Sequence, residues 1–272
     1  MSSRSLPIPA ASVGGIATQA LKRLLFPGLN LHARERYRYV PGKFGPEIAP
    51  GRRVLDAGCG NGMLAYQAWK RGAKVLGISI KQREVEGCRA MFNDGKGISD
   101  THLRFENTNL LEVAAQGHQF DAIICTEVLE HIRDDRSVCI KFFEMLKPGG
   151  CLYVTTPNAE HSYNKHFPLD LDARGGHVRP GYTFEMYRAL LEPIGFTLEE
   201  ISGLGGPIRQ AFNRWINAMQ ERFGVAAGLP PFLLALPFLW LDSRSPRVPM
   251  CLYASARKPA HVPDPKLGLG TK

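Results

Sequence analysis

Short apolar runs alternate with amphipathic segments between about residues 53 and 203. Each run has the length of a strand, and the segments between them repeat apolar residues at helical spacing. The predicted strands are Arg53–Ala57, Lys74–Ile80, His102–Glu106, Phe120–Thr126, Gly150–Thr156, Phe196–Ser202 and Met250–Lys258. The predicted helices are Gly62–Arg71, Lys81–Asn93, Arg133–Leu146 and Thr183–Pro193. This alternation predicts an α/β fold with a doubly wound, mostly parallel, seven-stranded sheet.

Two regions outside the alternation divide the chain further. The predicted parts are an N-terminal helical region over 1–50, a core over 51–204, a helical apolar insertion over 205–248, the last strand of the core over 249–258 and a flexible tail over 259–272. The insertion is expected to act as a substrate lid or a docking surface. Within it, Leu229–Leu241 (LPPFLLALPFLWL) is almost wholly apolar. A bilayer span needs about 20 residues, so this segment packs in the core, which we favour, or lies at a membrane surface.

Composition adds few constraints. The six cysteines show no CxxC spacing, which indicates reduced, buried thiols in a cytoplasmic protein. No secretory signal or transmembrane run is visible, so we expect neither secretion nor a membrane anchor. The formal net charge of +9 suits an anionic partner, but the basic residues are dispersed.

The most informative segment is Val54–Gly62 (VLDAGCGNG), where a predicted strand runs into a glycine-rich turn and then a helix. Glycines let the backbone approach a ligand and open the helix N-terminus toward it. Asp56 precedes these glycines. A carboxylate here repels a pyrophosphate and attracts a cationic amino-acid ligand, so the site is expected to prefer S-adenosylmethionine to NAD.

This segment resembles the first motif of the class I, Rossmann-like methyltransferases. The resemblance continues, in the family's order and spacing, through FDAIICTEVLEHI at 120–132, LKPGG at 146–150 and TTPN at 155–158. It implies S-adenosylmethionine as cofactor, with the glycine turn at its methionine part, the end of the second strand at the ribose and the residues after the third strand at the adenine. The implied cofactor-binding residues are Asp56, Gly58, Cys59, Gly60, Ser79, Ile80, Asn109, Leu110, Thr126 and Glu127.

Two positions depart from the family pattern. Ser79 stands where an acidic residue usually binds both ribose hydroxyls, and a neutral hydroxyl makes a weaker hydrogen bond. Asn109 stands where an aspartate often receives the adenine amino group, although its side-chain carbonyl can still accept that bond. The segment His32–Tyr39 could place an arginine on the cofactor carboxylate, but the pattern does not distinguish its three arginines, and simple surface charge is an equal alternative.

The acceptor side is expected after the fourth and fifth strands. Glu127-x-x-Glu130-His131 with the later His177 resembles the ubiquinone-pathway O-methyltransferases and the enzymes that methylate the terminal 2′-hydroxyl of small RNAs. That resemblance implies a divalent ion, such as magnesium, held by Glu127, Glu130, His131 and His177. Without a metal, His131 or His177 is the predicted general base. Alternatively, Glu130 and His131 cap or orient the helix that begins near Asp134.

Two further histidines, His161 and His166, are expected in a solvated loop. The predicted activity is O-methylation of a hydroxyl on a small molecule, sugar or lipid-linked intermediate. The alternatives are an RNA 2′-O-methyltransferase, a C-methyltransferase of a lipid or small molecule, a non-catalytic S-adenosylmethionine-binding partner protein and a membrane-surface enzyme that docks through Leu229–Leu241. Nucleic acid is disfavoured because no basic run is interleaved with aromatic residues.

Overall fold

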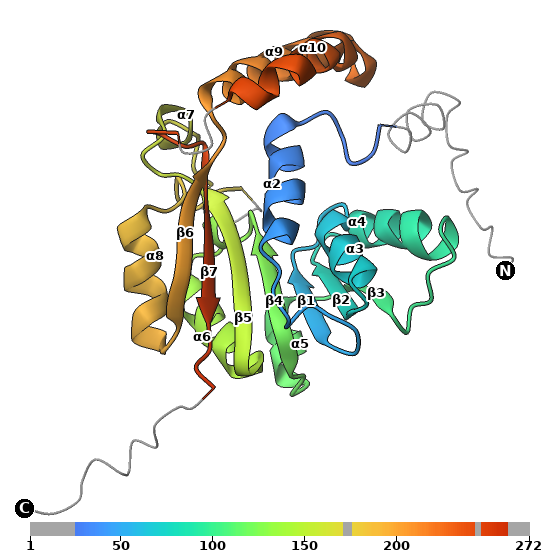
Figure 1. Ribbon diagram of the computed structural model, residues 1–272, viewed down its shortest axis with the longest axis vertical. Coiled ribbons are helices and arrows are strands. Elements are labelled where there is room, and N and C mark those ends of the chain that lie inside the picture. Colours follow the sequence, from blue (N-terminus) through green and yellow to red (C-terminus); the bar gives the residue numbers. More distant parts are fainter. Residues whose placement is uncertain (1–24, 171–175, 243–245, 261–272) are drawn as a thin grey trace, which may run out of the picture.

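Seven strands form a single sheet in the computed structural model, which describes residues 25–170, 176–242 and 246–260. Their order across the sheet is β3-β2-β1-β4-β5-β7-β6 (Figure 1). β7 is antiparallel to both of its neighbours, whereas the other pairs are parallel. The strands are β1 Arg53–Ala57, β2 Lys74–Ser79, β3 Leu103–Asn107, β4 Phe120–Thr126, β5 Leu146–Pro157, β6 Thr197–Leu204 and β7 Cys251–Arg257.

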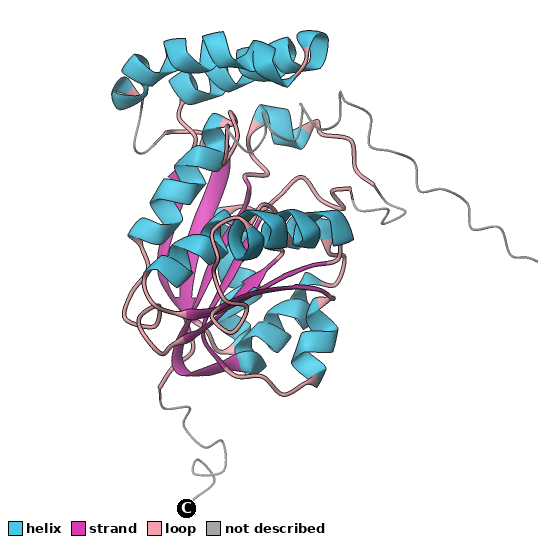
Figure 2. Ribbon diagram, turned by 90° about the vertical axis from the view of Figure 1, so that its right-hand side faces the viewer, coloured by secondary structure: helices cyan, strands magenta, loops and turns pink. Residues whose placement is uncertain are grey.

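Helices cover both faces of this sheet, as Figure 2 shows from the side. The buried cluster on one face draws on α2 (Leu31–Gly42), α3 (Met63–Lys70), α4 (Gln82–Cys88) and the π-helix Arg89–Asp94. The cluster on the other face draws on α5 (Leu110–Ala115), α6 (Asp135–Met145) and α8 (Phe184–Leu191). Two apolar layers with a sheet between them confirm the doubly wound fold. Short 3-10 turns at Leu129–His131 and Glu192–Ile194 and the helix α7 (Ser162–Lys165) complete this part.

The strand β5 is longer than the pattern predicts. Lys147-Pro148-Gly149-Gly150 ends α6 as expected, but the strand already begins at Leu146 rather than Gly150. Leu146 pairs with Phe120, and Gly149 donates to the carbonyl of Lys258 at 2.9 Å. A shift in register between Phe120 and Ala122 accommodates the turn residues inside the strand.

The insertion between β6 and β7 is helical, as predicted. It comprises α9 (Pro207–Phe223), α10 (Leu229–Ala235) and the 3-10 segments Val225–Gly228 and Leu236–Leu241. Only one side of Leu229–Leu241 is buried, in a small separate cluster with Leu29, Leu31 and Ile216. The expectation that this segment packs in the core is therefore wrong for most of its length, because the two sheet faces are already covered by other helices.

Several predictions concern the ends and the thiols of the chain. Residues 1–24 and 261–272 lie outside the described ones, so the N-terminal region is seen only from residue 25 and the predicted tail only to residue 260. All six cysteines are free and buried, as expected. In the described part of the chain, no helix combines the length and apolar character needed to cross a bilayer.

Candidate active site

The glycine turn after β1 presents bare backbone to open space. Gly58 and Cys59 donate to the carbonyl of Ile78 at 3.0 and 2.8 Å, which ties the turn to β2. Gly60 has a φ of +52°, and a Cβ built on it would meet no atom within 4 Å. A Cβ on Gly58 would lie 2.3 Å from Cγ2 of Val128, so the loop after β4 packs directly on this turn. The turn can thus admit a ligand on one side while the acceptor-side loop contacts it on the other.

Asp56, at the end of β1, is a buried carboxylate with one free oxygen. Its Oδ2 accepts the backbone N–H of Ala65 at 3.0 Å, whereas Oδ1 has no hydrogen-bond partner in the described structure. Burial raises the pKa of Asp56 to about 7. An unpaired buried carboxylate is costly unless a donor satisfies it, so this oxygen fits the ammonium of a cationic amino-acid ligand.

The end of β2 supplies an acidic group that sequence reasoning missed. Ser79 donates through its hydroxyl to Oε2 of Glu84 at 2.7 Å, and Glu84 lies in the first turn of α4. A carboxylate from the following helix therefore lies beside Ser79 at the end of β2. Ile80 is 72 % exposed, which leaves an apolar surface beside this pair. The sequence feature that could have identified this carboxylate is the acidic residue five positions after Ser79.

Asn109 and Leu110 begin α5, and Asn109 serves as a helix cap. Its Oδ1 accepts the N–H of Glu112 at 3.0 Å, and the Glu112 side chain reaches back to the backbone of Asn109. This capping box uses the side chain that was expected at the adenine. A contact between Asn109 and adenine stays a prediction. Cofactor binding by Thr126, at the end of β4, also stays a prediction.

Glu127, the residue after β4, has an unusual backbone conformation and two side-chain partners. It is the non-glycine residue with a positive φ in the described ranges, at +56°, a conformation held by its surroundings. Its Oε1 accepts the hydroxyl of Thr155 at 3.1 Å, and its Oε2 lies 3.6 Å from Nη1 of Arg36. Of the arginines in His32–Tyr39, Arg36 thus reaches Glu127, whereas Arg34 bonds the carbonyl of Gly28. A contact between one of them and the cofactor carboxylate stays a prediction.

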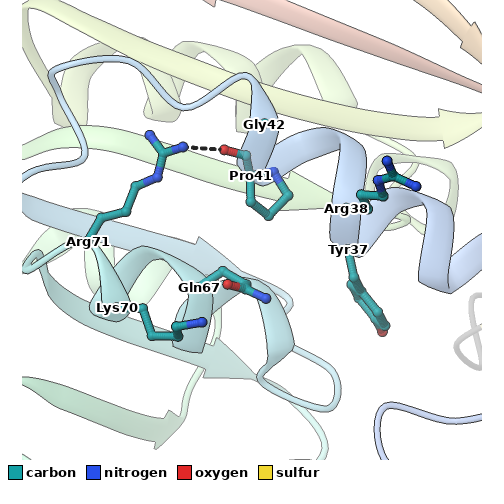
Figure 3. A pocket seen from close by; sticks show the side chains of 7 residues that line it. All are labelled: Tyr37, Arg38, Pro41, Gly42, Gln67, Lys70 and Arg71. Atoms are coloured by element: carbon teal, nitrogen blue, oxygen red, sulfur yellow. Dashed lines mark hydrogen bonds between the residues drawn. The ribbon is translucent and has the colours of Figure 1, made fainter.

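The third arginine, Arg38, lines a cavity of about 530 Å³ beside α2 and α3 (Figure 3). The other lining residues are Tyr37, Pro41, Gly42, Gln67, Lys70 and Arg71. Arg71 is held by the carbonyls of Phe44 and Pro41 at 2.6 and 2.7 Å. The walls carry three cations and none of the histidines or carboxylates expected in catalysis, so this cavity is not the reaction centre.

Glu130, His131 and His177 come together although His177 is far away in the sequence. One ligand atom from each lies within 4.8 Å of the others. Glu130 is 1 % exposed, and neither of its carboxylate oxygens has a partner among the described residues. Burial, with the neighbouring Glu127 carboxylate, raises the pKa of Glu130 well above its usual range. Such a group needs a proton, a cation or a substrate hydroxyl to satisfy it.

The backbone around Gly176 orients both imidazoles. The N–H of Val178 donates to the carbonyl of Glu130 at 2.8 Å, and Nδ1 of His131 lies 3.0 Å from the carbonyl of Gly176. The two rings meet edge to face with centroids 4.7 Å apart. Burial and the proximity of His131 lower the pKa of His177, and its Nδ1 is buried without a partner in the described structure.

Two expectations about neighbouring residues change and one is confirmed. Asp134, not Glu130 or His131, caps α6 by accepting the N–H of Ser137 at 3.1 Å. His161 is buried rather than solvated, and its Nε2 lies 3.0 Å from Oε1 of Gln210 in the insertion. His166 is exposed, as expected. The prediction for His161 was wrong because α9, which covers it, comes from a distant segment.

The sequence and the fold resemble those of known methyltransferases. A family model described as a methyltransferase domain matches residues 29–201. The ubiquinone biosynthesis O-methyltransferase of Psychrobacter arcticus is 32 % identical over 57 % of this chain and 62 % of its own length. The corresponding Pseudomonas fluorescens protein is 35 % identical over 57 % of this chain and 68 % of its own. A cyclopropane synthase structure from Mycobacterium tuberculosis has a TM-score of 0.58 at 19 % identity, covering 82 % and 83 % of the two chains.

Proposed function

We propose that this chain, which belongs to the methyltransferase domain family, transfers a methyl group from S-adenosylmethionine to a hydroxyl of a small-molecule acceptor. The observation that carries the proposal is the cluster of buried Glu130 with partly exposed His131 and His177, beside the loop that packs on the glycine turn. Proton-accepting groups are thereby held next to a backbone that can admit the cofactor. The relatives named as ubiquinone biosynthesis O-methyltransferases favour a hydroxyl as the methylated group.

The residues proposed to bind the cofactor are those with an unpaired polar atom, open space or an exposed surface near the glycine turn and the end of β2. Oδ1 of Asp56 would accept the ammonium of the methionine part, and Gly60 would let the backbone come close to it. Ser79 with Glu84 would bind the ribose hydroxyls, and Ile80 would pack on the adenine. When bound, the cofactor supplies a sulfonium-activated methyl carbon.

The reaction itself is an in-line displacement. The acceptor oxygen would form the new O–C bond while the C–S bond broke, with a neutral thioether as the leaving group. The hydroxyl proton passes to a nearby base. His131 is suited to this role because a carbonyl can only accept, so Nδ1 carries the proton toward Gly176 and neutral Nε2 keeps its lone pair. Nε2 lies 3.9 Å from Oε1 of Glu130, on the side of the cluster.

The same cluster fits a divalent cation. Glu130, His131 and His177 would hold it, with Glu127 close by, because the Glu130 oxygens and Nδ1 of His177 lack other partners in the described chain. A bound magnesium or similar ion would lower the pKa of the acceptor hydroxyl. The carbonyl of Gly176 would then orient the His131 ring, as outer hydrogen bonds do for metal-binding imidazoles.

Calorimetry tests the cofactor and the metal separately. Adenosylhomocysteine should bind the parent and bind Asp56→Ala at least tenfold more weakly. Manganese should bind the parent but not Glu130→Gln, whereas exposed Glu86→Gln should behave as the parent. Release of adenosylhomocysteine with a panel of hydroxyl acceptors tests the transfer. Absence of cofactor binding would overturn the proposal, and cofactor binding without metal binding would leave His131 as the base.

A further inference from the structure

The helical insertion carries apolar side chains on the side that it turns away from the protein. Pro231, Phe232 and Ala235 of α10 are buried against the cluster with Leu29 and Leu31. The exposed large apolar side chains of the insertion are Trp215, Phe223, Leu233, Leu234, Leu236, Phe238, Trp240 and Leu241, with exposed fractions from 42 to 78 %. We call these eight residues the apolar face. A helix that is apolar all round is normally buried or in contact with lipid.

The apolar face is continuous across the two arms of the insertion. The ring of Phe212 stacks on Trp215 of α9, with centroids 6.3 Å apart, and on Phe238 of the following arm, with centroids 6.0 Å apart. Figure 1 shows α9 and α10 side by side at the end of the molecule where the parallel strands have their carboxyl ends. Phe212 thus links Trp215 and Phe238, one residue of the apolar face from each arm of the insertion.

The insertion carries a small excess of positive charge, three arginines against two acidic residues, which suits an anionic surface as the partner. Residues 205–242 contain arginines at 209, 214 and 222, and acids only at 221 and 242. Arg209 and Asp242 pair with each other at 2.9 Å. Arg214 and Arg222 are exposed, and the Arg222 guanidinium lies 5.4 Å from the ring of exposed Phe223. Exposed tryptophans and leucines bordered by arginines match the apolar and charged layers of an anionic bilayer surface.

The insertion is held firmly to the catalytic domain. Oδ1 of Asn213 accepts the N–H of Leu31 at 2.8 Å, and Gln210 contacts His161. Arg209 bonds Glu35 at 2.9 Å on α2, the helix that also carries Arg36. A surface bound by the apolar face would thus have a fixed orientation relative to the acceptor side of the site.

We propose that the apolar face docks this protein peripherally on a membrane that contains anionic phospholipid. The eight side chains enter the boundary between headgroups and acyl chains, while Arg214 and Arg222 contact the phosphates. This docking goes beyond the proposed methyl transfer and does not depend on it. An acceptor that partitions into the bilayer would then meet the active site without first dissolving in water.

Vesicle binding of the full chain tests this docking. The protein should co-sediment with vesicles of phosphatidylcholine and phosphatidylglycerol, and less with phosphatidylcholine alone or in high salt. Trp240→Ser should weaken this binding roughly tenfold, since a largely exposed indole leaves water on docking. Leu111→Ser, also at an exposed apolar residue but on α5, should bind as the parent.

Tryptophan fluorescence gives a second measurement, which can be made on the parent protein without any substitution. Two of the three tryptophans, Trp215 and Trp240, belong to the apolar face. Vesicles with brominated acyl chains should quench the emission of the parent, and Trp240→Phe should lose part of that quenching. Equal vesicle binding by parent and Trp240→Ser would overturn the proposal. So would a dimer in sedimentation equilibrium that Trp240→Ser dissociates while vesicles do not bind. Adenosylhomocysteine binding, unchanged in Trp240→Ser, separates this test from that of methyl transfer.

Discussion

Nδ1 of His131 lies 3.0 Å from the carbonyl oxygen of Gly176, 45 positions later in the chain. Because a carbonyl oxygen accepts only, this contact places the proton of the neutral imidazole on Nδ1. The remaining nitrogen, Nε2, then faces Glu130 with a free lone pair. One backbone contact thus prepares the imidazole as a base or a metal ligand.

Replacing His131 should reduce turnover while cofactor binding remains. We expect His131→Gln to lower kcat by about 100-fold or more, the usual scale for loss of a positioned base. Affinity for adenosylhomocysteine should stay within about twofold of the parent value. Steady-state kinetics with calorimetry provide the measurement, and His166→Gln at an exposed histidine is the control. An unchanged kcat in His131→Gln would exclude His131 both as the general base and as a metal ligand needed for turnover.

Cofactor binding should release a proton near neutral pH. The pKa of Asp56 is about 7 without ligand because the carboxyl group is buried. A bound ammonium stabilises the carboxylate, so at pH 6 the group passes from mostly protonated to ionised. Calorimetry in buffers of different ionisation enthalpy should therefore detect release of nearly one proton, which Asp56→Asn should abolish. Proton release that persists in the variant would assign it to another group.

Glu84 should contribute to cofactor affinity although it lies outside the expected positions. Its carboxylate accepts the hydroxyl of Ser79 at 2.7 Å. We expect Glu84→Ala to weaken adenosylhomocysteine binding about tenfold, as loss of a charged hydrogen-bond acceptor does. Glu86→Ala, on the same helix, removes an exposed side chain that bonds Gln82 and should bind normally. Equal affinities of the two variants would remove Glu84 from the site.

Asp242 should hold the insertion in place. It accepts the N–H groups of Ile208 and Arg209 at 3.0 and 3.2 Å, and its side chain, 1 % exposed, pairs with the guanidinium of Arg209. Asp242→Ala leaves a poorly compensated charge and an uncapped helix, so urea unfolding should show a loss of about 3 kcal/mol. Glu192→Ala, which breaks an exposed pair with Arg188, should cost less than about 0.5 kcal/mol.

His32 should make the protein less stable in acid. Burial and nearby arginines lower its pKa from 6.5 to about 3. Between these values the unfolded chain binds more protons, so stability falls as the pH drops below 6.5. His32→Leu should therefore lose about 2 kcal/mol less than the parent between pH 8 and pH 5. Urea unfolding at both pH values measures this difference. An equal change in unfolding free energy for parent and His32→Leu would contradict the lowered pKa of His32.

The fold and the glycine turn were predictable because their signals are local. Strand and helix periods repeat within a few residues, and the glycine turn needs only the backbone freedom of its own residues. Asp56 was recognised in the same way, since it follows directly from the end of a strand. Its burial, however, depends on the layers that the fold packs around it.

The contacts that complete the site could not be predicted, since they join segments far apart in sequence. Periodicity does not reveal that Gly176 faces His131, that Arg36 rather than Arg34 reaches Glu127, or that Glu84 supports Ser79. It also gave Leu229–Leu241 a place in the core, although helices α2 to α8 already cover both faces of the sheet. The sequence by itself determined the layers of the fold, the glycine turn and the kinds of side chain from which a site can be built. Tertiary packing decided which side chains meet and which apolar side chains stay exposed, because both depend on distances that no local pattern encodes.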